Sequence, residues 1–358
     1  MSSELEQQLE GLFEGPEPDP GAGEEALHRA LRALQPVAAP HRGLRTGVLA
    51  FAAALVLLII AAGALATAGA LHVSIGSKTK PRHAPTLLVL PKGANGIAAV
   101  VDGRLSVITT SGLGLQGRPV SAAALSPRAL YVAAGTGNSL VAMAPDGRRA
   151  WTHHVGGKVV AIAWAPDGFR IAYIVYARHH YALHVIYGNG IHDTTIDGSV
   201  RAVKPSWRAD SLAVAYVGAG GKAVIYDIGH ESRKLIPVQA PVTGLAFAPT
   251  GDSMAVAQPT GVWVLHQSAA RKIPGAVESF GWLRGRLAVA GLGRGRDSAV
   301  VRVVGTDGVS RGSYRVRGTV VAITPKLVVV RSSRKLVGGK TTLLTIAPGA
   351  TVRDLAIG

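Results

Sequence analysis

The chain of 358 residues contains no cysteine. This absence excludes disulfide bonds, thiolate zinc sites, cysteine nucleophiles and a lipid-modified N-terminal cysteine, although it fits either redox compartment. The sequence also has no Gly-x-x-x-x-Gly-Lys-Ser/Thr phosphate loop. We therefore expect no catalytic residues and no cofactor, and the chain is predicted not to be an enzyme.

Acidic residues are scarce relative to basic ones, since 21 Asp and Glu against 38 Lys and Arg give a net charge of +17. Residues 1–45 hold eight acids and four arginines, a charge of −4, so the remainder carries +21. A basic domain is attracted to anionic surfaces such as lipid headgroups, envelope polymers or nucleic acid. Arginine-rich codon usage and solubility are the plainer explanation.

Aromatic residues are few as well, and this bears on nucleic acid as a partner. Single-strand binding requires aromatic side chains interleaved with basic ones. Only Tyr314 lies among the basic residues of the C-terminal part, which are Arg294, Arg296, Arg302, Arg311, Arg315, Arg317, Arg331, Arg334 and Lys335. We expect no nucleic acid, and a protein or an anionic envelope polymer as the partner.

Residues 46–71 contain no charged side chain and are rich in Ala, Leu, Val and Ile. About 20 apolar residues span a bilayer, so a single transmembrane helix is predicted over 46–71. A cleaved signal peptide is the rival, but its apolar stretch is typically about 7–15 residues and lies close to the N-terminus. Basic residues flank the segment on both sides, so the positive-inside rule decides little about orientation.

The segments around this helix have different characters. Residues 1–45 are predicted to be a cytoplasmic tail with two short amphipathic helices, the first marked by leucines at Leu5, Leu9 and Leu12. Helices below about 12–15 residues are marginal in water, so they would need a cytoplasmic partner or the membrane surface. A disordered tail is the alternative. Residues 72–85 are predicted to be a polar linker.

Beyond the linker, six units share one pattern, in which an apolar strand ends in a large residue, turns and restarts as a second apolar strand. They lie at 123–133, 163–175, 206–217, 246–257, 281–290 and 322–330. The large residues are spaced by 39, 43, 40, 35 and 41 positions, at Leu125, Trp164, Trp207, Phe247, Trp282 and Ile323. A period of about 40 is typical of four-stranded propeller blades.

A seventh, incomplete unit precedes these six, with apolar runs at 97–101 and 105–109 on either side of the turn Asp102-Gly103. We therefore predict an all-β propeller of about seven four-stranded blades over residues 86–358, with six or eight blades as alternatives. Residues 86–90 are expected to form a strand that completes the first blade or closes the ring against the last blade near 343–346, because closure removes exposed sheet edges.

Histidines are locally concentrated between 153 and 192. On a strand, His180 and His184 share a face, so with His192 three imidazoles could converge on zinc or copper. No carboxylate accompanies them at a fixed spacing, and loops tolerate histidine well. We expect a surface role and no metal site for the whole group, His153, His154, His179, His180, His184 and His192.

One unit carries a family resemblance. Trp164, Pro166-Asp167-Gly168 and Ile171-Ala172-Tyr173 resemble the Trp-Ser-Pro-Asp-Gly…Ile-Ala-Tyr signature of TolB-like and related WD-type propeller repeats, with Ala165 in place of the serine. Residues 140–151 are similar to the blade motif of quinoprotein-like propellers. TolB-like proteins are extracytoplasmic and bind envelope proteins, so the resemblance implies a propeller outside the cytoplasm. This chain lacks their separate N-terminal α/β domain.

Together these features predict a plasma-membrane protein with a cytoplasmic N-terminus and an extracytoplasmic propeller that binds a protein or envelope polymer without catalysis. The alternative is a transmembrane regulator whose tail binds a cytoplasmic partner, as anti-sigma-like proteins do, while the propeller senses outside. The zinc motif of cysteine and histidine that is common in anti-sigma tails is absent. A quinone- or metal-dependent propeller enzyme is the third class.

Overall fold

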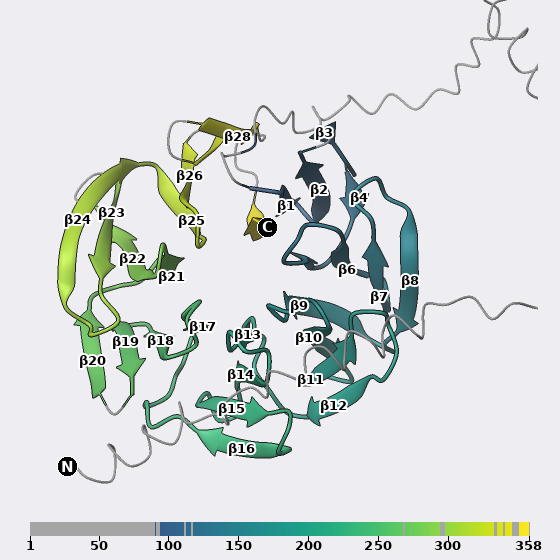
Figure 1. Ribbon diagram of the computed structural model, residues 1–358, viewed down its shortest axis with the longest axis horizontal. Coiled ribbons are helices and arrows are strands. Elements are labelled where there is room, and N and C mark those ends of the chain that lie inside the picture. The colour runs from purple at the N-terminus through teal and green to yellow at the C-terminus, as the bar shows by residue number, and fades with distance from the viewer. Residues whose placement is uncertain are drawn as a thin grey trace, which may run out of the picture. The chain divides into compact units, whose positions relative to one another are not determined.

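The computed structural model describes residues 90, 94–110, 112–115, 117–267, 269–293, 298–332, 335–338, 341–345 and 351–357, in which every regular element is a β-strand. Seven antiparallel sheets follow one another around a central axis in chain order (Figure 1). The prediction of an all-β propeller is confirmed, and the blade number of this part of the chain is seven.

Blades 2 to 7 each have four strands, numbered outward from the axis. Blade 2 contains β5 (Ala123–Leu125), β6 (Val132–Thr136), β7 (Ser139–Met143) and β8 (Arg149–His154). Blade 3 contains β9 (Lys158–Trp164), β10 (Arg170–Ala177), β11 (His180–Tyr187) and β12 (Thr194–Asp197). Blade 4 contains β13 (Ser206–Trp207), β14 (Ala213–Val217), β15 (Ala223–Asp227) and β16 (Ser232–Leu235).

The remaining complete blades repeat the arrangement. Blade 5 contains β17 (Gly244–Phe247), β18 (Ser253–Gln258), β19 (Gly261–His266) and β20 (Ala269–Pro274). Blade 6 contains β21 (Ser279–Leu283), β22 (Arg286–Leu292), β23 (Ser298–Val304) and β24 (Ser310–Arg317). Blade 7 contains β25 (Thr319–Ile323), β26 (Val328–Ser332), β27 (Lys335–Gly338) and β28 (Thr341–Thr345).

Blade 1 combines both ends of the propeller sequence. Its strands β1 (Gly96–Val101), β2 (Arg104–Thr109), β3 (Gly112–Leu113) and β4 (Arg118–Pro119) come from the start. Its innermost strand is the C-terminal β29 (Val352–Ile357), which pairs antiparallel with β1 (Figure 1). The ring is therefore closed by the last strand of the chain. The prediction that residues 86–90 close the ring was wrong, because β29 is the closing strand. Residues 86–89 themselves lie outside the described residues.

The large residue that marks each unit lies at or next to the end of the innermost strand, as the period of about 40 predicted. In three blades this residue is tryptophan, and its indole N–H donates a hydrogen bond to a backbone carbonyl of the preceding blade. The three bonds are Trp164 Nε1 to Ala124 O (3.1 Å), Trp207 Nε1 to Ala163 O (3.0 Å) and Trp282 Nε1 to Ala246 O (2.9 Å). The repeat thus encodes a bond between blades as well as a buried apolar surface.

The core consists of one apolar layer at every junction between neighbouring blades. The second strand of each blade is apolar on both faces, because each face packs against a different neighbour. In β10, for example, Ala172 and Ile174 pack toward blade 4, whereas Ile171 and Tyr173 pack toward blade 2. This arrangement explains why these strands show no alternation of polar and apolar residues.

The predicted tail (1–45), transmembrane helix (46–71) and linker (72–85) lie outside the described residues. Among the residues that the structure describes, no helix is long and apolar enough to cross a membrane. The transmembrane helix and the orientation of the chain therefore stay predictions.

Candidate binding face

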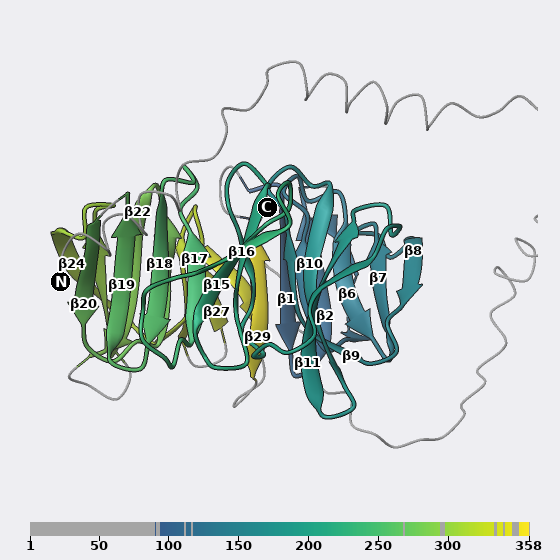
Figure 2. The same ribbon diagram turned by 90° about the horizontal axis from the view of Figure 1, so that it is seen from below.

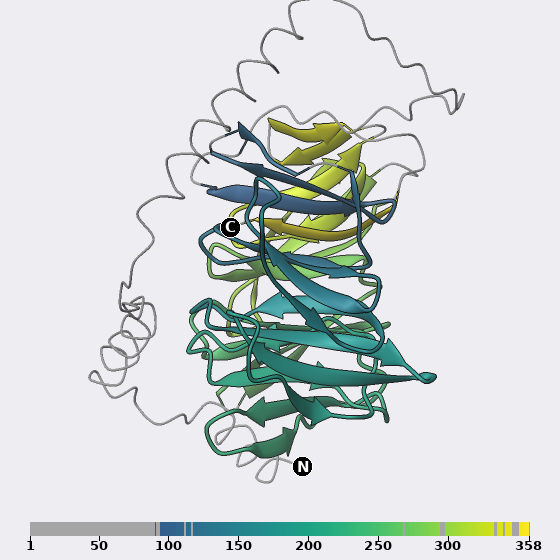
Figure 3. The same cartoon turned by 90° about the vertical axis from the view of Figure 1, so that its right-hand side faces the viewer.

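The loops of the propeller fall on two faces, because successive strands of each blade run in opposite directions. The loops between first and second strands and between third and fourth strands lie on one face, which we call the turn face. The C-terminal end of β29, an innermost strand, marks the turn face, and the tip of the hairpin between β10 and β11 projects at the opposite end (Figures 2 and 3).

Five large apolar side chains are exposed on the turn face of blades 2 and 3. Their exposed fractions range from 42% to 60%, and the residues are Leu130, Tyr131, Phe169, Tyr187 and Ile191. We call this set the apolar patch. Charged and polar residues lie in the same loops, among them Arg128, Asp167 and Asn189, all exposed. An exposed apolar cluster with a polar rim is the usual anatomy of a protein-binding surface.

The blade 3 loops that carry Phe169, Tyr187 and Ile191 are joined by backbone hydrogen bonds. The amide of Gly188 donates to the carbonyl of Phe169 (2.7 Å), and the amide of Tyr187 donates to the carbonyl of Ile191 (3.0 Å). From β8 of blade 2, Trp151 Nε1 donates to the carbonyl of Gly188 (2.8 Å). These bonds hold the blade 3 part of the patch at defined positions, which lowers the entropy lost on binding.

The turn that presents Phe169 follows from its sequence. Pro166 restricts φ at the first turn position, and Asp167 Oδ1 accepts a hydrogen bond from the amide of Phe169 (2.8 Å). Gly168 has φ of +78°, a backbone conformation that favours glycine. The same Asp-to-amide bond recurs in the turns at Asp146 and Asp210. The repeat signature therefore builds the loops of the turn face.

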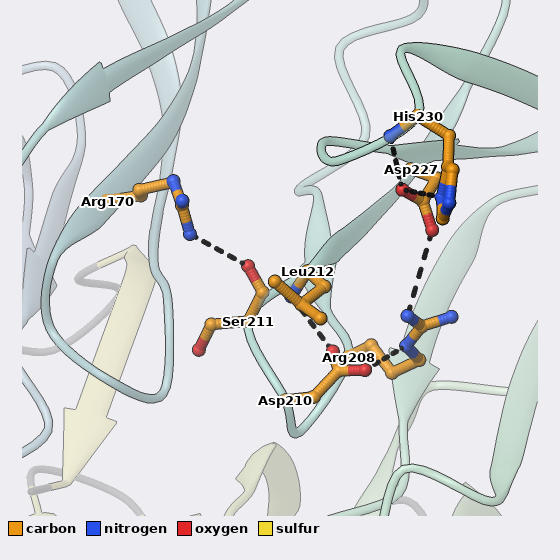
Figure 4. Close-up of polar contacts among 7 residues, drawn as sticks. All are labelled: Arg170, Arg208, Asp210, Ser211, Leu212, Asp227 and His230. Atoms are coloured by element: carbon orange, nitrogen blue, oxygen red, sulfur yellow. Dashed lines mark hydrogen bonds and ion pairs between the residues drawn. The ribbon is translucent and has the colours of Figure 1, made fainter. Parts of the chain in front are cut away.

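Blade 4 supports the turn of blade 3 from the other side. The amide of Asp167 donates to Ser211 Oγ (3.0 Å), and Arg170 Nη1 donates to the carbonyl of Ser211 (3.3 Å), as Figure 4 shows for the second bond. Ser211 is 1% exposed and belongs to the equivalent turn of blade 4. The patch is therefore attached to a platform that extends over three blades.

A buried ionic cluster holds the turn of blade 4 (Figure 4). Arg208 is 7% exposed, and its Nε lies 2.7 Å from Asp210 Oδ2 while its Nη2 lies 3.9 Å from Asp227 Oδ2. Burial alone would raise the pKa of Asp227, but hydrogen bonds from the backbone and ring of His230 and the charge of Arg208 lower it. Two carboxylates thus balance the buried guanidinium, as a buried cation requires.

The histidine group does not assemble as the three-imidazole hypothesis required. His184 of blade 3 and His153 of blade 2 both contact Asp193. His184 Nδ1 and His153 Nε2 each lie 3.3 Å from Asp193 Oδ2. Tyr173 donates to Asp193 Oδ1 (2.8 Å). Burial and this bond raise the pKa of Tyr173. Within the described part of the chain, no group of three His, Asp or Glu side chains is arranged to hold a metal ion.

The other histidines lie apart from this cluster. His192 packs edge-on against Tyr187, with ring centroids 5.1 Å apart, and His180 Nδ1 lies 3.3 Å from the carbonyl of Arg178. His154 and His179 are exposed. Sequence reasoning found the concentration of histidines but missed Asp193, which directly follows His192, as the shared neighbour of His153 and His184, because His153 belongs to a different blade.

The apolar patch was also missed from the sequence. Part of its signal was present in the repeat units: Phe169 directly follows the turn Pro166-Asp167-Gly168, and Leu130 takes the equivalent place in blade 2. Of the basic residues in blades 6 and 7, Arg311, Arg315 and Arg317 are exposed on the outermost strand β24, and Lys335 is exposed on β27. Arg302 on β23 and Arg331 on β26 are half-buried. Arg294, Arg296 and Arg334 lie outside the described residues.

No protein-family model matches the chain, and no curated protein matches its sequence. Solved structures do resemble it. TolB from Acinetobacter baumannii has a TM-score of 0.48 and 15% identity, covering 74% of this chain and 66% of that one, slightly under two thirds. A putative TolB from Agrobacterium tumefaciens has a TM-score of 0.45 and 13% identity, covering 63% and 90%.

A further similar structure is the β-propeller domain of Cps50 (Swd1) from Myceliophteria_thermophila, with a TM-score of 0.52 and 12% identity, covering 74% of this chain and 96% of that one. At this identity the likeness is one of fold. The chain is a β-propeller.

Proposed function

We propose that the chain is a membrane-tethered propeller at the plasma membrane, exposed outside the cytoplasm, that binds a protein partner through the apolar patch and performs no catalysis. The observation that carries the proposal is the patch itself. Five large apolar side chains are exposed on loops of blades 2 and 3, and hydrogen bonds join the blade 3 turn to blade 4. Exposure of such an apolar surface to water is unfavourable in free energy, and surfaces of this kind are typical of interaction sites.

The tether is supported by the uncharged run over residues 46–71, which has the length a bilayer requires. The resemblance of residues 164–173 to TolB-like repeats supports a propeller outside the cytoplasm. An anionic envelope polymer is the second class of partner, and the net charge of +21 beyond residue 45 supports it. A protein partner is favoured because the patch presents aromatic and aliphatic side chains, which polyanions use poorly.

A photocrosslinking amino acid tests the binding face in intact cells. Placed at Ile191 it should give one discrete protein adduct, whereas placed at Ser199, an exposed residue on the opposite face, it should give none. Phe169→Asp should abolish the adduct from Ile191 while changing the free energy of unfolding by less than about 0.5 kcal/mol, because Phe169 is exposed. Equal crosslinking from both faces, or an adduct that survives Phe169→Asp, would contradict the proposal.

Single cysteines test the tether, since the chain has no cysteine of its own. An impermeant thiol reagent applied to intact cells should label Ser199→Cys and leave Ser3→Cys unlabelled. Labelling at residue 3 alone would reverse the orientation. Labelling at residue 199 in a protein that is released without lysis would show that the anchor is cleaved.

A regulatory role of the tail is the second candidate, supported by the leucines of residues 1–45 and by the tail's own charge of −4. In that case deletion of residues 2–45 should abolish a cytoplasmic response while leaving the crosslink from Ile191 unchanged. A response that persists after the deletion would remove this candidate.

A further inference from the structure

The junction between blades 6 and 7 contains a groove of about 650 Å³ between the outer strand β24 of one blade and strands β26 and β27 of the next. Pockets that hold small organic ligands have volumes of about 300–1,000 Å³. A protein partner would need roughly 800 Å² of surface from this chain. The groove is therefore suited to a small molecule.

The groove exists because this junction lacks large side chains. All five tryptophans of the chain precede residue 283, and Tyr314 is the only aromatic residue after it. The buried layer between blades 6 and 7 consists of alanine and valine alone. The layer between blades 3 and 4 contains two aromatic residues, one leucine and two isoleucines, namely Trp207, Tyr216, Leu183, Ile174 and Ile196. Small residues leave space between sheets whose separation is set by the ring.

The walls and the rim of the groove have different chemistry. Six of its eleven lining residues are aliphatic: Leu283, Val316, Leu327, Val328, Val330 and Val337. Three are cations, namely Arg284, Arg317 and Lys326, and none of the eleven is acidic. Arg284 and Arg317 are exposed, so their guanidinium groups can contact a ligand while they remain hydrated. Tyr314 and Ser332 add hydroxyl groups.

We propose that this groove binds a small amphipathic organic anion, with its apolar body against the aliphatic walls and its carboxylate or phosphate group at Arg284. This residue lies with Lys326 at the turn-face end of the groove, whereas Arg317 lies at the opposite end. Arginine pairs with both kinds of anion through parallel N–H donors. An apolar molecule without charge would leave the cations unused, and an inorganic anion would leave the aliphatic walls in water. The site is distinct from the apolar patch, which lies on blades 2 and 3.

Photolabelling tests the site with the full-length chain in phosphatidylcholine nanodiscs. The probe is octanoate carrying a diazirine, and mass spectrometry locates the labelled peptides. Label is expected on β24 and β26, and unlabelled octanoate should compete whereas octanol should not. Label spread evenly over the blades, or equal competition by octanol, would overturn the proposal.

Two variants separate charge from shape. Arg284→Gln should weaken octanoate binding by at least about tenfold, since hydrogen bonds to charged groups are worth about 1.5–3 kcal/mol and 1.4 kcal/mol is tenfold. Val330→Trp should block the groove without altering its charge. The matched control is Arg315→Gln, because Arg315 is an exposed arginine of β24 that does not line the groove. Loss of binding in the control equal to that in Arg284→Gln would contradict a specific site.

The same chemistry is found in free fatty carboxylates and in anionic lipids of the bilayer. Replacing phosphatidylcholine with phosphatidylglycerol in the nanodiscs distinguishes the two sources. If a lipid occupies the groove, phosphatidylglycerol should reduce the label on β24 and β26, and if a free anion occupies it, the label should be unchanged. Both results support an anionic amphiphile, provided that octanoate still competes.

Discussion

The junction between blades 3 and 4 and the junction between blades 6 and 7 occupy equivalent places in the ring but are built differently. In the first, Trp207 fills the layer and bonds to Ala163 of the preceding blade. In the second, the equivalent residue is Ile323, whose side chain has no hydrogen-bond donor. The same repeat position thus produces a hydrogen-bonded junction in one half of the propeller and a groove in the other.

Polar contacts enlarge this difference. Between blades 3 and 4, Asp197 accepts a hydrogen bond from Tyr216 (2.9 Å) and pairs with Arg233 (3.9 Å), and Ser211 joins the two turns. The comparison indicates that blades 2 to 4 form a stiff platform for the apolar patch, whereas blades 6 and 7 keep space that a ligand can fill.

The largest expected effect comes from opening the ring. Removal of residues 351–358 deletes β29 and exposes the edge of β1. We expect a loss comparable with the roughly 5–15 kcal/mol that stabilises a typical domain, because the closing strand supports both neighbouring junctions. The truncated chain should aggregate or exchange strands through the free edge. Size-exclusion chromatography and thermal melting measure this, and a monomer with an unchanged melting temperature would refute closure by β29.

The next effect compares the two junctions at the same repeat position. Trp207→Ala should lower the free energy of unfolding by about 3–5 kcal/mol, because it leaves a cavity in a filled layer. Ile323→Ala should lower it by only about 1 kcal/mol, since a half-buried side chain loses part of the roughly 1.5–3 kcal/mol of full burial. Denaturant unfolding followed by circular dichroism provides both values. Equal losses would mean that the junctions are packed alike.

A smaller effect concerns charge pairs in equivalent turns. Asp227→Asn should lower stability by about 1.5–3 kcal/mol, because Asp227 balances the buried Arg208. Asp307→Asn in blade 6 should lower it by less than about 1 kcal/mol, since the Arg311–Asp307 pair is nearly half exposed. Denaturation of each variant beside the unaltered protein gives the values.

The pH dependence of the Asp227 effect has a defined sign. The folded-state pKa of Asp227 is lowered from the unfolded value of 3.8, so its stabilising contribution is complete above that value. The contribution is lost as the pH falls through the lower folded-state pKa. The difference between the unaltered protein and Asp227→Asn should therefore vanish in acid, and a difference that grows in acid would show that Asp227 is not held as a carboxylate.

The blades could be predicted from the sequence, but the candidate binding sites could not. The spacing of Trp164, Trp207 and Trp282 located innermost strands because a local pattern of strand, large residue and turn recurs in blades 2 to 7. Closure was assigned to the wrong segment, since β29 carries no repeat signature and pairs with a strand more than 250 residues away. Asp193 and the groove depend on contacts between blades, and such contacts leave no short-range pattern in the chain.

Hydrogen exchange of the full-length chain in phosphatidylcholine nanodiscs tests the contrast between the two junctions directly. Backbone amides of β14 should exchange at least about tenfold more slowly than those of β26, and added octanoate should slow exchange in β24 and β26 alone. Equal exchange in β14 and β26, or protection by octanoate in blades 3 and 4, would contradict a stiff platform on one side of the ring and a ligand groove on the other.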